Sequence, residues 1–238
     1  MRKPKGLSLK DVKSAISFDQ PKLLAEQSND NIVIKGKFVL VDRNSFPDPA
    51  GPLAEYDILL EVTNRFPIDE PKLFEVGGRI PREPERHINT DGSCCVCVWE
   101  YWLAREENPS FEAYLNGPVY SFFISQFTYE QTGQWPFGEW RHGVHGLEEA
   151  YSEILNIPCD REKVIAYLEV LSMEWPKGHL LCPCGSGKII RECHSRDLLD
   201  LHQRLAPQLA KRMRDRLRAL SKPSKVGYRQ SRVLRRFP

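Results

Sequence analysis

Four side chains with the chemistry of metal ligands lie in one short segment of the sequence. Residues 182–194 read CPCGSGKIIRECH, so Cys182 and Cys184 are one residue apart, and Cys193 and His194 return after eight intervening residues. Gly185-Ser186-Gly187 supplies a sharp turn, because glycine reaches positive φ at little cost. Three thiolates and one imidazole form a closed tetrahedral site of the kind that holds structural zinc. The spacing therefore predicts one structural Zn²⁺ per chain, with no open position for a reacting water.

A second group of thiols, Cys94, Cys95 and Cys97, lies in the segment HINTDGSCCVCV, residues 87–98, directly after a polar turn. Side chains alternate in an extended chain, so either Cys94 packs inward and Cys95 is exposed, or the reverse. A reactive cysteine needs partial exposure and a lowered pKa or a pre-placed donor. Adjacent thiols on opposite faces do not converge on one metal, so the cluster favours a nucleophile over a second metal site. Partly buried cysteines without chemistry are the alternative.

The features around this cluster follow a definite order over roughly residues 31–130. The segment EYDILLEVT is followed by Phe66-Pro67-Ile68-Asp69-Glu70-Pro71, then Gly92-Ser93-Cys94-Cys95-Val96, then Trp102 and Pro109. This order is similar to that of the ubiquitin-conjugating enzymes, which have a strand, Tyr-Pro-x-x-x-Pro, His-Pro-Asn, Gly-x-Ile-Cys-Leu, a Trp and a Pro that opens a helix. The resemblance implies an α+β fold of that family, an antiparallel sheet with flanking helices, and it places Cys95 on the catalytic cysteine.

The chain departs from the family at His-Pro-Asn. Counting back from Gly92 without gaps puts His87 where the family has the Asn that supports the oxyanion. If His87-Ile88-Asn89 is instead aligned with the tripeptide, Asn89 takes that role and the loop is two residues short. We favour the gapless count, because a histidine can donate a hydrogen bond to an oxyanion and can also act as a base.

The resemblance implies a thioester transferase. The C-terminus of a carrier protein would move from an activating enzyme to Cys95 and then to an amine. The segment 182–194 in turn resembles the SEC-C motif, an interaction module found in many unrelated proteins. Bacterial proteins of this kind resemble components of CBASS-type antiphage operons, which implies a role in antiviral defence with a cGAS-like nucleotidyltransferase as an expected carrier.

A non-catalytic adaptor is the alternative function. In that interpretation the same fold is a scaffold, and the zinc module and a basic C-terminal tail bind a protein or nucleic-acid partner. Adduct formation at Cys95 distinguishes the two.

Composition and charge are those of an ordinary globular protein: 41% of the 238 residues are hydrophobic and 28% are charged. No stretch approaches about 20 apolar residues, and the N-terminus lacks the apolar segment of a secretory signal, so we expect a cytoplasmic protein with no membrane partner. Clustered cysteines suit a reducing compartment.

The charge is unevenly distributed along the chain. Residues 203–238 hold 12 Lys and Arg against one acidic residue, which leaves 22 basic and 31 acidic residues before them. A solvated tail, a nucleic-acid or other acidic partner, and the acidic body of the protein itself are the three interpretations.

The expected elements set the positions of both cysteine groups. We expect strands at 31–42, 55–63 and 72–76, a Pro/Gly-rich turn at 46–52, and an irregular functional segment at 79–107. Helices are expected at 8–25 with a break at Pro21, from Pro109 onward with a kink at Gly117-Pro118, and at 147–155, 160–174 and 195–220. The predicted domains are 1–175, ubiquitin-conjugating-enzyme-like; 176–220, the SEC-C module with an amphipathic helix; and 221–238, the basic tail.

Overall fold

The computed structural model describes residues 6–43, 51–137, 139–141, 143–220 and 232–234. The chain divides into two compact units. The sheet unit comprises Met1–Trp99, Glu106–Glu139 and Leu234–Pro238, and the knuckle unit comprises Glu100–Arg105 and Trp140–Val233. Of the described helices, none is both long enough and apolar enough to cross a membrane.

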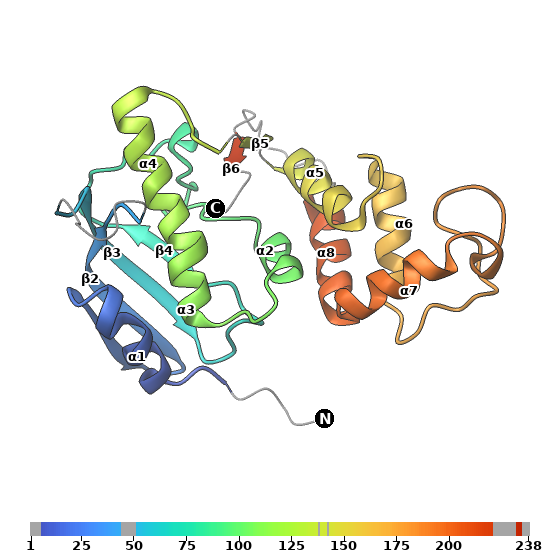
Figure 1. Cartoon of the computed structure of the whole chain (residues 1–238), viewed down its shortest axis with the longest axis horizontal. Coiled ribbons are helices and arrows are strands. Elements are labelled where there is room, and N and C mark those ends of the chain that lie inside the picture. Colours follow the sequence, from blue (N-terminus) through green and yellow to red (C-terminus); the bar gives the residue numbers. More distant parts are fainter. Residues whose placement is uncertain (1–5, 44–50, 138, 142, 221–231, 235–238) are drawn as a thin grey trace. The chain divides into compact units, whose positions relative to one another are not determined.

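The sheet unit contains a four-stranded antiparallel sheet whose strands follow one another in chain order (Figure 1). Its strands are β1 (Leu23–Ser28), β2 (Asn31–Leu40), β3 (Ala54–Thr63) and β4 (Lys72–Glu75). Its helices are α1 (Leu9–Asp19), α3 (Phe111–Tyr114) and α4 (Tyr120–Thr132), with a π-helical turn at Leu115–Val119 and a 3-10 turn at Pro84–Arg86. The predicted α+β class, an antiparallel sheet with flanking helices, is confirmed.

The core of this unit lies between one face of the sheet and α4. Residues of β3 alternate strictly between buried and half-buried, as expected for a sheet with one covered face. Phe123 of α4 stacks on Phe38 and Tyr56, with ring centroids 4.8 and 4.5 Å apart, and these two residues are register partners in β2 and β3. Each such buried side chain contributes roughly 1.5–3 kcal/mol.

The first helix is shorter than predicted. It begins at the capping box of Ser8 and Asp11 and ends at Asp19, and the following segment becomes β1 rather than more helix. Gln20 explains the switch, because its side-chain amide donates to the Val39 carbonyl at 3.0 Å and its oxygen accepts the Val39 N–H at 2.7 Å. The residues that continue past Pro21 are thereby held beside β2.

The predicted kink at Gly117-Pro118 is a π-helical turn between α3 and α4. A proline inside an α-helix clashes with the carbonyl four residues earlier and lacks a donor, and a π-helical turn changes that spacing. The helix start is as expected, because Ser110 caps α3 by accepting the Ala113 N–H at 3.1 Å.

The knuckle unit is helical. It contains α5 (Val144–Leu155), α6 (Arg161–Leu171), α7 (Ser195–Arg204) and α8 (Pro207–Leu220), a 3-10 turn at Ile190–Glu192, and all but the first residue of α2 (Trp99–Arg105). The single helix predicted for 195–220 is two helices, because Pro207 disfavours helical geometry in the residue before it and itself starts α8.

The two compact units divide the chain differently from the predicted boundary after residue 175. α8 packs against α6 and α5, which the sequence assigned to the first domain. Of the predicted basic tail, Arg232–Leu234 forms β6, which pairs with β5 (Glu139–Arg141). The rest of the tail and most of the predicted turn at 46–52 lie outside the described residues.

Candidate functional site

A tight hairpin brings the thiol cluster back beside His87. Ile88 and Cys94 form an antiparallel bridge, the Asn89 N–H donates to the Ser93 carbonyl at 2.8 Å, and Gly92 turns the chain at a φ of +84°. The Cys95 N–H then donates to the His87 carbonyl at 2.7 Å. The backbones of His87 and Cys95 are therefore hydrogen-bonded partners, eight residues apart in sequence.

The hairpin is attached to the edge of the sheet. The Cys94 N–H donates to the Leu73 carbonyl of β4 at 2.7 Å, which ties the hairpin to that strand. The position of Cys95 is consequently fixed by the sheet on one side and by the residues after the 3-10 turn on the other.

The cysteines of the cluster differ in exposure. Cys94 and Cys97 are buried at 7% and 8% exposure, whereas Cys95 is half-buried. Of the two orientations left open by the alternation pattern, the inward one belongs to Cys94. Burial raises the pKa of the Cys94 thiol to about 12, so this thiol stays protonated at neutral pH.

His87 adopts a left-handed backbone, with a φ of +54°, and is only 1% exposed. Its ring packs edge-on against Trp135, with centroids 4.6 Å apart, and Trp135 stacks on Tyr129 at 4.4 Å. The main chain of His87 thus lies beside that of Cys95, while its imidazole packs in a cluster of aromatic side chains with Trp135 and Tyr129.

The side chain of Asn89 stabilises the turn that precedes Cys95. Its amide donates to the Ser93 hydroxyl at 3.0 Å, and that hydroxyl donates to the Asp91 carboxylate at 2.6 Å. The hydrogen bonds from the Ser93 hydroxyl and N–H lower the pKa of Asp91, and Lys72 adds to the effect at 3.5 Å. The Asn89 side chain is therefore engaged within the turn.

Two sets of hydrogen bonds that stabilise this region were not predicted from the sequence. The buried carboxylate of Glu75 accepts the N–H groups of Gly77, Gly78 and Ile80 at 2.9, 3.0 and 3.3 Å. Arg86 donates to the Gln126 side chain at 2.9 Å, and Gln126 donates back to the Arg86 carbonyl at 2.8 Å. Glu75 and Arg86 lie in or next to a segment that has no apolar periodicity. Without such a pattern, the presence of a charged residue is the only sequence signal for either interaction.

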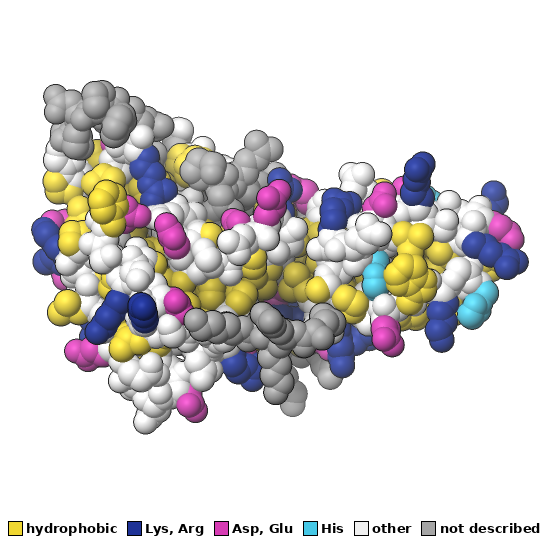
Figure 2. All heavy atoms as spheres, turned by 60° about the horizontal axis from the view of Figure 1, so that its bottom comes forward, with side chains coloured by type: hydrophobic (Ala, Val, Ile, Leu, Met, Phe, Trp, Pro, Cys, Tyr) yellow, Lys and Arg dark blue, Asp and Glu magenta, His cyan; other side chains and the backbone are white. Residues whose placement is uncertain are grey.

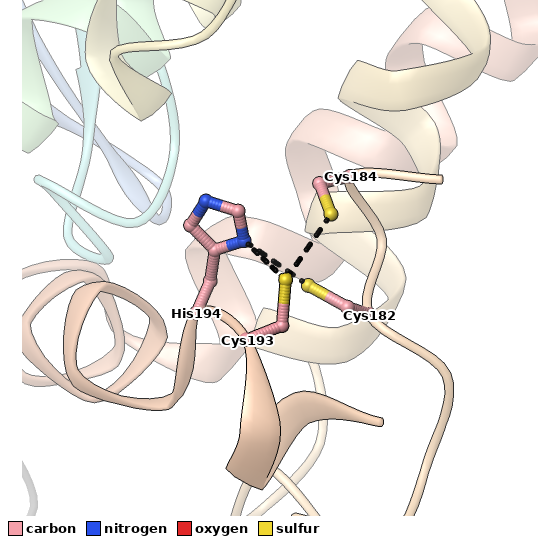
Figure 3. Close-up of side chains that lie close together, drawn as sticks. All are labelled: Cys182, Cys184, Cys193 and His194. Atoms are coloured by element: carbon pink, nitrogen blue, oxygen red, sulfur yellow. Dashed lines mark hydrogen bonds between the residues drawn. The ribbon is translucent and has the colours of Figure 1, made fainter. Parts of the chain in front are cut away.

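The predicted metal ligands converge in the knuckle unit. The ligand atoms of Cys182, Cys184, Cys193 and His194 all lie within 4.8 Å of one another. Figure 3 shows the Cys193 sulfur at the centre of the group. Cys193 Sγ lies 3.6 Å from Cys184 Sγ and 3.1 Å from His194 Nδ1, and Cys182 Sγ lies 3.3 Å from the same nitrogen. This cluster could hold a metal ion, as the spacing predicted.

The donor set and its spacing fit zinc. Metal–sulfur bonds of about 2.3 Å in a tetrahedron separate sulfurs by roughly 3.8 Å, close to the observed spacing. The turn is formed by Gly185 and Gly187 at φ of +82° and +75°, and it is closed by the bridge between Leu181 and Ile189. A hydrogen bond with Ser186 lowers the pKa of Cys184 to about 6, while burial raises the pKa of Cys182 to about 11.

Two adjoining hollows lie beside this cluster within the knuckle unit. One of about 380 Å³ is lined in part by Cys184, His194 and Tyr167. A second, of about 330 Å³, shares Asn156, Leu201 and Arg204 with it. The first hollow therefore opens onto two side chains of the Cys/His cluster.

The arginines of α8 are occupied by partners inside the knuckle unit. Arg212 and Arg216 contact Glu100, Arg214 contacts Asp215 and Ser172, and Arg218 contacts Glu169. Figure 2 shows acidic and basic side chains interspersed on the face that it draws. Each of these four arginines therefore has an acidic partner within the knuckle unit.

The structure brings the metal ligands together and pairs the backbones of His87 and Cys95, while Asn89 is held in the adjoining turn. Comparison with protein-family models, curated proteins and solved structures gives no match for this chain.

Proposed function

We propose that this chain is a ubiquitin-conjugating-enzyme-like transferase that forms a thioester between Cys95 and the C-terminus of a carrier protein and passes it to an amine. The observation that carries the proposal is the difference in solvent exposure among the three cysteines of one short segment. Cys95 is half-buried at the end of a hairpin attached to the sheet, and the neighbouring thiols are buried. A single accessible thiol on a rigid support is what thioester exchange needs.

The reaction has two balanced steps. The Cys95 thiolate attacks the carbonyl carbon of the activated carrier, and the thiolate of the activating enzyme leaves. An acceptor amine then attacks the new thioester, an amide bond forms, and the Cys95 thiolate is released after the amine loses a proton. Each step passes through an oxyanion, for which one hydrogen-bond donor is worth roughly 3 kcal/mol.

The proposed metal is zinc and its role is structural. Four protein ligands leave no coordination position for a substrate, so the ion would stabilise the turn at 182–194 and shape the surface around it. By the resemblance to antiphage proteins, the proposed carrier is a cGAS-like nucleotidyltransferase, and an activating enzyme is a further proposed partner. The proposed setting is the bacterial cytoplasm.

One observation favours the adaptor as a second candidate. The His87 ring is buried against Trp135, and Asn89 is exposed but its amide is bound to Ser93, so both predicted donors are engaged within the fold. In an adaptor, the hollows beside the metal ligands would take the partner and Cys95 would carry no adduct.

A trapping experiment separates these functions. The purified chain is incubated with ATP and a lysate of its native host, and Cys95 adducts are identified by mass spectrometry before and after hydroxylamine. We expect a hydroxylamine-sensitive adduct that Cys95→Ser converts to a more stable oxyester or abolishes. Cys159→Ser, which alters an exposed thiol outside the cluster, is the matched control.

Further substitutions test the individual roles. His87→Ala should slow transfer about 10²-fold if the imidazole donates to the oxyanion, and Asn89→Ala should have a smaller effect. Loss of the adduct in a folded Cys94→Ser variant would mean that the nucleophile is one residue earlier, and absence of any adduct would favour the adaptor.

A further inference from the structure

Gln126 is a polar residue of α4 that binds Arg86 through both ends of its side-chain amide. It is fully buried, with an exposed fraction of 0%. Arg86 donates to the Gln126 side-chain oxygen from Nε at 3.1 Å and from Nη2 at 2.9 Å. The Gln126 side-chain nitrogen in turn donates to the Arg86 main-chain carbonyl at 2.8 Å. We call these three hydrogen bonds the Gln126 bracket.

Two further residues of α4 contact the Arg86 guanidinium. It lies over the Tyr129 ring, 4.8 Å from the centroid, and one of its nitrogens is 3.8 Å from the Glu130 carboxylate. Gln126, Tyr129 and Glu130 are three and four residues apart, so they share one face of the helix. Because a buried amide without hydrogen-bond partners is unfavourable, the Arg86 carbonyl is held firmly against this face.

His87, the next residue, connects the bracket to the thiol. Its left-handed backbone, with a φ of +54°, is uncommon outside glycine and persists only where neighbouring contacts impose it. The Gln126 bracket fixes the peptide group before His87, and the ring of His87 packs on Trp135. The peptide group after His87 carries the carbonyl that accepts the Cys95 N–H at 2.7 Å.

All of these contacts lie within the sheet unit, whose segments include both the thiol cluster and α4. Hydrogen bonds and a single intervening residue therefore join a buried amide of α4 to the main chain of Cys95. A change at Gln126 reaches the thiol through the carbonyl to which Cys95 is bonded.

We infer that Gln126 is a positioning residue for Cys95. By fixing the Arg86 carbonyl, it holds His87 in the left-handed conformation that accepts the Cys95 N–H, and so it sets how the thiol is presented. The consequence for transfer rests on the proposed function. The positioning is measurable without a carrier, because amide hydrogen exchange reports on the Cys95 N–H and alkylation reports on its thiol.

Two substitutions separate the two halves of the bracket. Gln126→Glu keeps an oxygen for the Arg86 guanidinium, in a charge-assisted bond, and loses the donor to the Arg86 carbonyl. Gln126→Met removes both and keeps a side chain of similar length. A role limited to binding the guanidinium would be rescued by Gln126→Glu, whereas positioning through the carbonyl would not.

We expect exchange of the Cys95 N–H to rise about tenfold or more in both variants, through local opening. The rate of iodoacetamide alkylation at Cys95, followed from pH 6 to pH 9, should change by about threefold or more. Exchange of the Ile34 N–H, in the central strand β2, serves as the reference for global opening and should change by a smaller factor.

Two controls distinguish positioning from general stability. Ser125→Ala alters the preceding residue of α4, which is also fully buried, and leaves the bracket intact. Phe123→Leu destabilises the sheet unit from its core, and is compared at the same free energy of unfolding. The inference is overturned if Gln126→Met leaves exchange and alkylation at Cys95 unchanged, if Gln126→Glu restores both, or if Phe123→Leu changes both equally.

Arg86→Met covers the case in which neither Gln126 variant folds. It removes the guanidinium and keeps the main-chain carbonyl that Gln126 binds, so Cys95 exchange should rise only about threefold. An unchanged exchange rate in the folded Arg86→Met protein would count against the bracket. Absence of a carrier adduct in the unaltered chain would instead contradict the proposed transferase and leave the exchange result standing.

Discussion

At the scale of single residues, Cys94 and Cys95 are sequence neighbours with different surroundings. Cys94 is buried and donates its N–H to the Leu73 carbonyl of β4, while Cys95 is half-buried and its N–H donates to the His87 carbonyl. Nucleophilic attack requires a thiolate, so accessibility and pKa decide which of the two can react.

The raised pKa of Cys94 gives a prediction about pH. With a pKa of about 12, Cys94 is protonated in the folded state up to strongly alkaline pH. At pH 9 only about one thiol in a thousand would be ionised. We expect alkylation of Cys94 to remain slow from pH 7 to pH 10 in the folded protein, because the thiol stays protonated over that range.

Denatured protein is the control for this prediction, because unfolding should return Cys94 to the alkylation rate of Cys159. The same shift in pKa predicts how stability depends on pH. The free energy of unfolding falls as the pH rises above the ordinary thiol pKa, since only the unfolded thiol ionises there. Rapid labelling of Cys94 at pH 8 in the folded state would contradict the burial of this side chain.

At the scale of elements, Gly36 in β2 has a steric reason to be glycine. Its φ is +132°, and a Cβ added there would lie 2.2 Å from the Lys22 carbonyl oxygen. Lys22 precedes β1, so this close approach is where the chain enters the sheet.

We predict that Gly36→Ala destabilises the protein by about 2–4 kcal/mol through backbone strain and the clash. Gly117→Ala is the matched control, because its added Cβ would meet nothing within 4 Å and alanine favours a helical backbone by roughly 0.5–1 kcal/mol. Urea unfolding curves measure both. Equal stability of the Gly36→Ala variant and the unaltered chain would be incompatible with the close approach to Lys22.

The turn at 182–194 gives a second prediction at this scale. It is too small to form a core, so metal binding should supply most of its folding free energy. We expect one zinc per chain by elemental analysis, and chelation should abolish amide protection around the Leu181–Ile189 bridge before α4 is affected. Release should increase as the pH falls, because protons compete for the thiolates and the imidazole.

A double substitution, Cys182→Ser with Cys184→Ser, is the corresponding variant. It should purify without zinc and behave like the chelated protein. Stoichiometric zinc retained by this variant would place the metal elsewhere.

The elements that sequence could predict are those with local patterns. Strands 55–63 and 72–76 have apolar alternation, and Ser110 and Asp160 are caps with nearby partners. The ligand cluster was likewise encoded by spacing within thirteen residues. What could not be predicted depends on distant partners: β1 forms because Gln20 bonds to Val39, and Glu100 is buried because arginines more than a hundred residues later receive it.

At the scale of the whole molecule, part of the uneven charge along the sequence is paired internally. Arg212 and Arg216 of α8 bind Glu100 and Arg218 binds Glu169, which supports the interpretation that the basic region pairs with the acidic body. The burial of Glu100 and the packing of α8 on α5 and α6 make α8 an integral part of the knuckle unit.

We predict that a chain ending at Trp175 does not fold independently. It loses α7 and α8, exposes the apolar faces of α5 and α6, and leaves Glu100 without Arg212 and Arg216, a loss of about 3–5 kcal/mol for a broken buried pair alone. A chain ending at Leu220 keeps these contacts and should unfold cooperatively. Circular dichroism melts and gel filtration of the two fragments make the comparison.

Cooperative melting of the fragment ending at Trp175, with Cys97 still protected from alkylation, would show that the sheet unit needs nothing from α8. Aggregation of the chain ending at Leu220 would instead assign a structural role to the residues beyond it.

The burial of Glu100 against two arginines of α8 also has a consequence for the order of events during protein synthesis. Glu100 is made 112 residues before Arg212, the first of its arginines. At ordinary rates of translation that interval is roughly 6–20 s. Throughout it Glu100 lacks both arginines, so its carboxylate is not yet neutralised for burial. The helical packing of the knuckle unit around Glu100 can therefore be completed only after α8 has emerged from the ribosome.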